Sequence, residues 1–144
     1  MAKFEVIVGS VLGASEYVAD AIQDTLQSAA HQVTIHLQPD LADIDRDAIW
    51  IICTSTNGAG DLPDNIQPFA DSLKDQQLSH LEYLIVGLGD SSYDTFCQGA
   101  MTMEALLNAC GAKLLKPAAH IDVLTHQIPE DKAVEYIQSW LDEK

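Results

Sequence analysis

Strand-like and helix-like stretches alternate along the whole chain, and this rhythm constrains the fold more than any other feature. Short runs of apolar and β-branched residues, typical of buried strands, occupy residues 4–8, 33–37, 48–53 and 83–88, with a fifth expected within 113–123. Between them, apolar residues recur every three or four positions, as on one helix face, over residues 15–30, 66–73, 96–110 and 129–141. This alternation predicts βαβ units, a parallel sheet and right-handed crossovers.

The number of expected strands predicts a doubly wound domain with helices on both faces of its sheet. Five parallel strands in this rhythm fit an α/β three-layer sandwich with strand order 2-1-3-4-5. The chain has 144 residues, which favours a single domain spanning 1–144. In such a sheet, ligands bind beyond the carboxyl ends of the strands, where the strand order reverses. The loops after the first, third and fourth strands therefore form the candidate site.

The charge of the chain argues against some partners. Acidic residues number 22 against 7 basic ones, which gives a formal net charge of −15. An acidic surface repels nucleic-acid phosphates and anionic lipid, so we expect neither nucleic acid nor a membrane as partner. The charge suits fast encounters with a basic partner face. It equally serves to keep a protein soluble, and the composition leaves both interpretations open.

The amino end and the cysteines indicate a cytoplasmic protein without a metal site. Residues 1–6 are typical of a strand rather than a signal peptide, and no apolar run has the length of a membrane span. Cys53, Cys97 and Cys110 form no Cys-x-x-Cys pair, so neither a zinc site nor a disulfide framework is indicated. The five histidines are scattered without the spacing of metal ligands.

The first candidate loop, residues 9–15, runs from a strand directly into a helix and has the composition of a phosphate site. Backbone N–H groups and the positive helix end point at one spot in such a turn. Gly13 allows close backbone approach, and Ser10 and Ser15 offer hydroxyl donors, while no lysine or arginine is present. The same residues are also ordinary helix caps, so this loop alone leaves two interpretations open.

The second candidate loop, residues 54–65, is rich in glycine and small polar residues. Its sequence is Thr-Ser-Thr-Asn-Gly-Ala-Gly-Asp-Leu-Pro-Asp-Asn. Two glycines permit tight backbone approach to a flat ligand. The alternative is a flexible turn capped by Asp61 or Asp64 before the next helix.

The third candidate loop, residues 87–97, carries an aromatic side chain among small polar residues. Tyr93 is placed to cover a planar ring. Phe96 fits the apolar face of the following helix, and we expect Cys97 to be a buried thiol.

Motifs in these loops resemble those of the flavodoxins. Residues 9–17 resemble the phosphate loop Ser/Thr-x-Thr-Gly-x-Thr, and residues 55–65 resemble Ser/Ala-Thr-aromatic-Gly-x-Gly-Asp-x-x-Asp-Asn of the FMN domains in diflavin reductases. Residues 87–97 are similar to Gly-Leu-Gly-Asp-Ser-Ser-Tyr-x-x-Phe-Cys in sulfite-reductase-type flavodoxin domains. The likeness runs from end to end and is greatest to stand-alone short-chain flavodoxins of the MioC type. It implies a flavodoxin-like three-layer sandwich.

The resemblance also implies FMN binding by the three loops. The phosphate would be cradled by Ser10, Val11, Leu12, Gly13, Ala14 and Ser15. One side of the isoalloxazine ring would be bordered by Ser55, Thr56, Asn57 and Gly58, with the Gly58 carbonyl near flavin N5. The other side would be bordered by Leu88, Gly89, Asp90, Tyr93, Phe96 and Cys97, with Tyr93 stacking on the ring. Asp122, after the fifth strand, is a further match.

Two departures from the family pattern predict weaker FMN binding than in a typical flavodoxin. Val11 and Leu12 stand where flavodoxins place hydroxyls, and Ala14 replaces a polar residue. Two or three hydrogen bonds to a charged group are then missing, each worth roughly 1.5–3 kcal/mol. Asn57 replaces an aromatic residue, which forfeits about 1 kcal/mol of stacking beyond its burial. We therefore expect the protein to be isolated partly without FMN.

The family implies an electron carrier rather than an enzyme, without a catalytic residue of its own. FMN would supply the redox chemistry. A flavodoxin reductase-type donor would deliver the electrons, and a basic-faced redox enzyme would accept them, for example an iron–sulfur enzyme such as biotin synthase. We expect a monomer.

Three other functions are considered for a chain with these loops. A flavodoxin-like binding or regulatory module that has lost FMN stays open, because of the altered first loop and Asn57. An enzyme such as a quinone reductase also stays open, and direct hydride transfer from NAD(P)H would reveal it. A phosphoacceptor receiver domain needs an acidic pair after the first strand and an aspartate ending the third. Gly9-Ser10 and Cys53-Thr54 occupy those places and argue against it.

Overall fold

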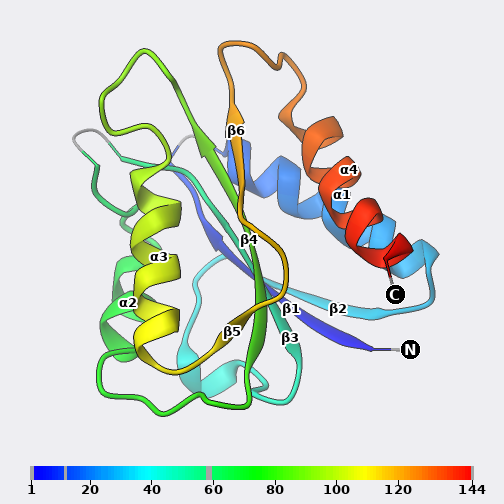
Figure 1. Ribbon diagram of the computed structural model, residues 1–144, viewed down its shortest axis with the longest axis vertical. Helices are drawn as coiled ribbons and strands as arrows, with labels where there is room; N and C mark the ends of the chain where they lie inside the picture. Colours follow the sequence, from blue (N-terminus) through cyan, green and yellow to red (C-terminus); the bar gives the residue numbers. More distant parts are fainter. Residues whose placement is uncertain (1, 12, 58–59, 144) are drawn as a thin grey trace.

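The computed structural model describes residues 2–11, 13–57 and 60–143, in which a sheet lies between two layers of helices (Figure 1). The strands are β1 (Lys3–Gly9), β2 (Gln32–His36), β3 (Ile49–Thr54), β4 (Glu82–Gly89), β5 (Lys113–Leu114) and β6 (Ala119–Asp122). The helices are α1 (Ala14–Ser28), α2 (Gln67–Ser72), α3 (Gln98–Ala109) and α4 (Pro129–Asp142), with a 3₁₀ turn, η1, at Leu41–Asp43. Helices α1 and α4 cover one face of the sheet, and α2 and α3 cover the other (Figure 1).

The strand order confirms the expected sheet. Neighbouring strands pair in parallel in the order β2-β1-β3-β4-β5, and β6 also pairs with β4. β5 and β6 are two pieces of the fifth strand: Glu82 and Tyr83 pair with β5, and residues 86–89 pair with β6. Pro117 lies between the two pieces and has no N–H to donate to the ladder, which accounts for the break.

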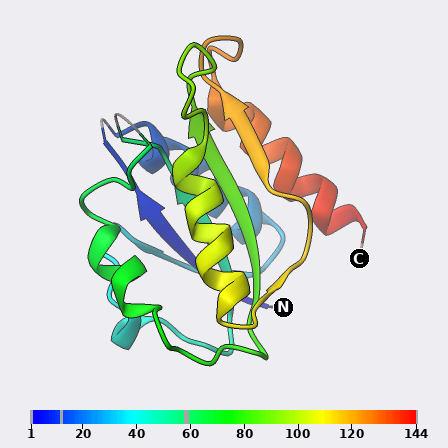
Figure 2. The same ribbon diagram turned by 60° about the vertical axis from the view of Figure 1, so that its left-hand side comes forward.

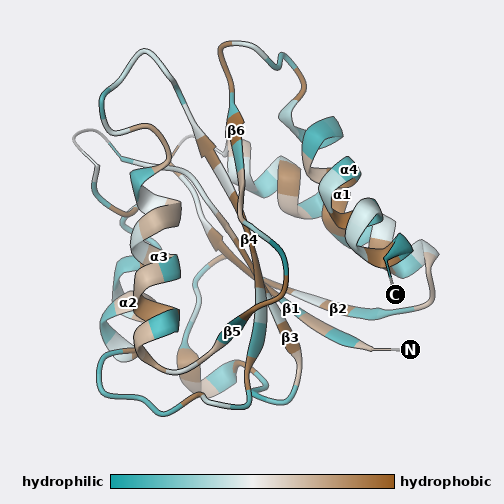
Figure 3. Cartoon of the chain, in the orientation of Figure 1, coloured by the Kyte–Doolittle hydropathy of each residue, from teal (hydrophilic) through white to brown (hydrophobic). Residues whose placement is uncertain are grey.

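Two apolar cores, one on each face of the sheet, hold the layers together. On β1, Phe4, Val6 and Val8 belong to the core beneath α1 and α4, whereas Ile7 belongs to the core beneath α2 and α3. Strands buried on both faces are typical of parallel sheets. The predicted apolar helix faces are confirmed by side chains without solvent exposure: Val18, Ile22, Leu26, Met103, Leu107, Ala133 and Ile137. Figure 3 shows hydrophobic residues concentrated along the sheet and alternating with hydrophilic ones around the helices.

Two helices are shorter than the sequence pattern predicts. α2 spans only Gln67–Ser72. α3 begins at Gln98, because Cys97 before it has a left-handed backbone with a φ of 53°. Phe96 therefore lies outside the helix and is only half-buried, so its expected place on the apolar helix face is wrong. None of the helices in the described ranges is both long and apolar enough to cross a bilayer.

Helix α1 ends in a Schellman motif that has alanine where glycine is usual. The Ala30 N–H donates to the Gln27 carbonyl at 3.0 Å, and the His31 N–H donates to the Leu26 carbonyl at 3.1 Å. Ala30 has a φ of 67°. This left-handed conformation costs a residue with a side chain about 1–2 kcal/mol.

We expect Ala30→Gly to raise the free energy of unfolding by about 0.5–1 kcal/mol, because the relieved strain exceeds the added freedom of the unfolded chain. Ala29→Gly is the matched control, since Ala29 is also exposed but has a φ of −93°. Glycine there should lower the free energy of unfolding by about 0.5–1 kcal/mol. Urea unfolding measures both variants, and a destabilised Ala30→Gly protein would contradict the prediction.

Candidate functional site

The parallel register brings the ends of three strands to one edge of the sheet (Figure 2). Gly9 at the end of β1 pairs with Thr54 at the end of β3, and Thr54 pairs with Gly87 near the end of β4. The Ser55 N–H donates to the Gly9 carbonyl at 2.9 Å, which continues the ladder past the strand ends. The three candidate loops therefore start next to one another.

The first loop ends in a helix terminus that none of the described side chains caps. Gly13 is the N-cap of α1, with a φ of 87°, a conformation that favours glycine. The Gly13 N–H donates to the Ser10 hydroxyl at 2.9 Å, which folds the loop back on itself. The backbone N–H groups in the first turn of a helix have no acceptor within the helix, and they attract anions. Ala14 and Ser15 supply these groups here, while Leu12 lies outside the described residues.

The hydroxyl of Ser15 has a structural use. Ser15 has no solvent exposure, and its Oγ lies 2.6 Å from the Oγ of Ser55 on the second loop. The hydroxyl expected to donate to a phosphate is thus buried and paired with Ser55 within the protein. The Ser10 hydroxyl lies 3.4 Å from the Glu16 carboxylate, so a negative charge stands beside this loop.

The second loop is a tight turn docked against α3. The Asn57 N–H donates to the Asp61 carbonyl at 2.7 Å, and the Asp61 N–H donates back to the Asn57 carbonyl at 3.0 Å. The Gly99 N–H, in the first turn of α3, donates to the Thr56 hydroxyl at 2.9 Å. A Cβ on Gly99 would lie 2.6 Å from the Ser55 carbonyl oxygen, so only glycine permits this contact. Gly58 lies outside the described residues.

The third loop is held by two aspartates. Asp90 accepts hydrogen bonds from the Ser92 N–H at 2.9 Å and from the Ser92 hydroxyl at 2.6 Å. Asp122 accepts from the Ser91 N–H at 3.2 Å and from the Leu124 N–H at 3.0 Å. Hydrogen bonds from Ser91, and then from Leu124, lower the pKa of the Asp122 carboxyl below its usual value. Asp122 therefore ties the loop after β4 to the turn after β6.

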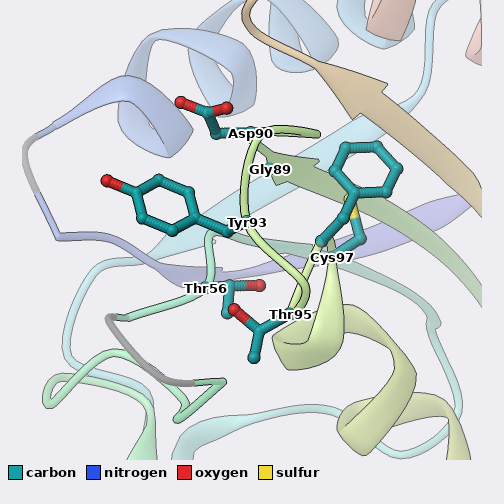
Figure 4. Close-up of a pocket in the computed structure, with 7 residues that line it drawn as sticks. Thr56, Gly89, Asp90, Tyr93, Thr95 and Cys97 are labelled. Atoms are coloured by element: carbon teal, nitrogen blue, oxygen red, sulfur yellow. The ribbon is translucent and has the colours of Figure 1, made fainter.

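A cavity opens between the second and third loops (Figure 4). Its volume is about 480 Å³, within the range of roughly 300–1,000 Å³ that is common for small-molecule sites. The lining residues are Thr56, Gly89, Asp90, Tyr93, Thr95, Phe96 and Cys97. All of these except Thr95 were expected from the sequence. Thr95 was missed because it occupies a variable position of the loop motif.

Two features give the cavity its shape. A Cβ on Gly89 would lie 2.8 Å from the Cys97 backbone nitrogen, so glycine is needed where the loop closes over the end of β4. Tyr93 is 62% exposed at the mouth. Figure 4 shows the side chains of Tyr93 and Asp90 extending on the side of the loop away from Cys97. An exposed aromatic ring beside a cavity has the position of a lid for a planar ligand.

The other expected site residues that the structure describes are not part of this cavity's wall. They are Ser10, Val11, Gly13, Ala14, Ser15, Ser55, Asn57 and Leu88. Leu88 is 2% exposed and belongs to the core beneath α1 and α4, so its side chain is turned away from the cavity. The hydrogen bond between Ser15 and Ser55 joins the uncapped N-terminus of α1 to the second loop. The next residue of that loop, Thr56, lines the cavity.

The arrangement fits a flat group that carries a phosphate. The cavity lies between Thr56 and the Tyr93 loop, and a helix N-terminus without a side-chain cap has backbone N–H donors suited to an anion. Among the described residues, no group of histidine, cysteine, aspartate or glutamate side chains could hold a metal ion.

Comparison with known proteins agrees with the motifs. The sequence model of the flavodoxin family matches residues 6–136. Protein MioC of Escherichia coli (strain K12) is 40% identical over 143 residues, which cover 98% of this chain and 97% of that protein. Flavodoxin YqcA of the same strain is 33% identical over 144 residues, which cover 97% of each chain. The structure of a cysteine-to-serine mutant of a flavodoxin from Pseudomonas aeruginosa is similar, with a TM-score of 0.88 at 30% identity, over 96% of this chain and 95% of that one.

The Cys97 thiol should be unreactive in the folded protein. Cys97 has no solvent exposure, and burial raises its pKa to about 12. The thiolate is the reactive form, so at pH 8 we expect alkylation of native Cys97 about a thousandfold slower than in urea. Mass spectrometry after timed iodoacetamide treatment measures the two rates. Rapid modification of Cys97 in the native protein would contradict the prediction.

Proposed function

This chain belongs to the flavodoxin family, electron carriers that bind FMN, and on that premise we propose how its three loops hold the cofactor. The single observation that carries the proposal is the pairing of a ring-sized cavity with an uncapped helix terminus at the same edge of the sheet. FMN supplies the redox chemistry by taking up and giving off one or two electrons.

The phosphate would bind at the N-terminus of α1. The backbone N–H of the exposed Ala14 and the positive end of the helix dipole support this placement. The Ser10 hydroxyl accepts a hydrogen bond from the Gly13 N–H, which keeps the loop folded back on itself. Because the described part of this loop has no cationic side chain, phosphate binding would rest on backbone dipoles.

The flavin ring would occupy the cavity between the second and third loops. Tyr93 would cover the exposed face of the ring, and its exposure leaves it free to do so. Gly89 and Thr56 would border the ring. The Thr56 hydroxyl accepts a hydrogen bond from the Gly99 N–H, which holds the second loop against α3. The expected weakening by Val11, Leu12, Ala14 and Asn57 stays a prediction.

Electron exchange would occur at the Tyr93 rim with separate partner proteins. Asp90, Asp94 and Asp122 surround this rim, whereas Lys3 and Lys113 lie at the opposite ends of their strands. This distribution supports docking of a basic partner face by electrostatic steering. A flavodoxin reductase-type protein would deliver electrons to the bound FMN. An iron–sulfur acceptor such as biotin synthase, a monomeric state and a cytoplasmic setting remain predictions.

We expect Tyr93→Ala to raise the dissociation constant for FMN about 10- to 100-fold, because the ring loses its stacking partner. Tyr93→Phe is the matched control and should bind FMN within about threefold of the natural chain, since the aromatic face is kept. Quenching of flavin fluorescence on titration with apoprotein measures all three constants. Equal affinities for the alanine and phenylalanine variants would remove Tyr93 from the site.

We also expect the reduced protein to react with basic cytochrome c more slowly as salt is added. Raising ionic strength from about 10 mM to about 0.3 M should lower the second-order rate constant about tenfold, because the salt screens the acidic rim. Ferricyanide, an anionic oxidant, is the control and should react faster with added salt. Stopped-flow absorbance follows both reactions. A rate with cytochrome c that does not depend on salt would contradict a charge-steered encounter.

A further inference from the structure

The side chain of Asn65, on the loop before α2, joins three separate segments of the chain. Its Oδ1 accepts a hydrogen bond from the Ser10 N–H at 2.9 Å. Its Nδ2 donates to the Val8 carbonyl at 2.7 Å and to the Leu37 carbonyl at 2.9 Å. One carboxamide therefore bridges the end of β1, the start of the first loop and the residue that follows β2.

The three partners of Asn65 demand a carboxamide. Two carbonyl oxygens require two N–H donors, and one backbone N–H requires an acceptor, which is the set that an asparagine amide offers. Aspartate would offer oxygens alone and would repel both carbonyls. Leucine has nearly the same shape but no polar atom. The partners also decide which amide atom is oxygen, because the reverse orientation would place an NH₂ group against the Ser10 N–H.

A short chain of bonds leads from Asn65 to the helix terminus. Asn65 holds the backbone of Ser10, and the Ser10 hydroxyl accepts the Gly13 N–H at 2.9 Å. Gly13 is the N-cap of α1 and sets the direction of the N–H groups that follow it. Without a cationic side chain in the described part of the loop, anion binding depends on the aim of these dipoles, so small displacements of Ser10 matter.

We propose that Asn65 is a positioning residue that gives this chain its preference for FMN over riboflavin, by holding the first loop in its anion-binding conformation. The inference rests on the proposed placement of the phosphate at the N-terminus of α1. Asn65 does not line the cavity proposed for the ring. Its loss should therefore act on the phosphate and spare the ring, in contrast to a change at Tyr93.

The test compares the affinities of variants for FMN and riboflavin, which differ by the phosphate. Asn65→Leu should weaken FMN binding about 10- to 100-fold while changing riboflavin binding less than about threefold. Asn65→Ser, which is too short to reach all three partners, should follow the same trend. Asp64→Ala is the matched control, because Asp64 is the exposed neighbour on the same loop and its carboxylate lies 3.5 Å from the Gln67 amide, away from the first loop. Its two affinities should equal those of the natural chain.

A second measurement needs no flavin. In the apoprotein, the Ser10 amide should exchange its hydrogen at least about tenfold faster in Asn65→Leu than in the natural chain, while amides of β3 keep their protection. Exchange rates followed by NMR report this difference directly, even where a variant binds no ligand.

The outcomes separate this inference from the proposed function. Equal losses of FMN and riboflavin binding, or unchanged Ser10 exchange, would overturn the role of Asn65. A natural chain that prefers FMN, together with an Asn65→Leu variant that keeps the full preference, would overturn that role alone. A natural chain that binds both flavins equally would overturn the phosphate placement as well.

Discussion

The parallel alignment of β1, β3 and β4 is the constraint on which the rest of this structure depends. Their hydrogen-bonded register places Gly9, Thr54 and Gly87 side by side. Parallel strands must all return by crossovers, so the loops that leave them gather at one edge. The uncapped N-terminus of α1 and the cavity lie at the same edge for this reason, although Gly13 and Tyr93 are far apart in the sequence.

Hydrogen bonds between loops, rather than ion pairs, give this edge its shape in the described part of the chain. Ser15 contacts Ser55, Thr56 receives the Gly99 N–H, and Asp122 receives the Ser91 N–H. Each contact ties one loop to the next element, so the loops support one another around the cavity. Gly89 and Gly99 allow the backbone to approach closely where a Cβ would collide with it.

The absence of a cation from the described part of the first loop fits an electron carrier with an acidic rim. Backbone dipoles can bind a phosphate without adding a positive side chain beside the rim. The carboxylates near Tyr93 would then stay available to attract a basic partner. The flavin ring, the phosphate and the partner would thus each be recognised by a different kind of group: an aromatic face, backbone amides and surface carboxylates.

The sequence by itself determined the strand order, the buried faces of the helices and the edge at which the candidate loops gather, because these follow from hydrophobic periodicity and from the geometry of parallel strands. It also identified every residue of the cavity wall except Thr95. The tertiary structure alone decided that Cys97 turns Phe96 out of α3, that the Ser15 hydroxyl bonds to Ser55, and that Asn65 bridges three segments. These features depend on hydrogen bonds between residues distant in the chain and on local backbone angles, and neither leaves a periodic signal in the sequence.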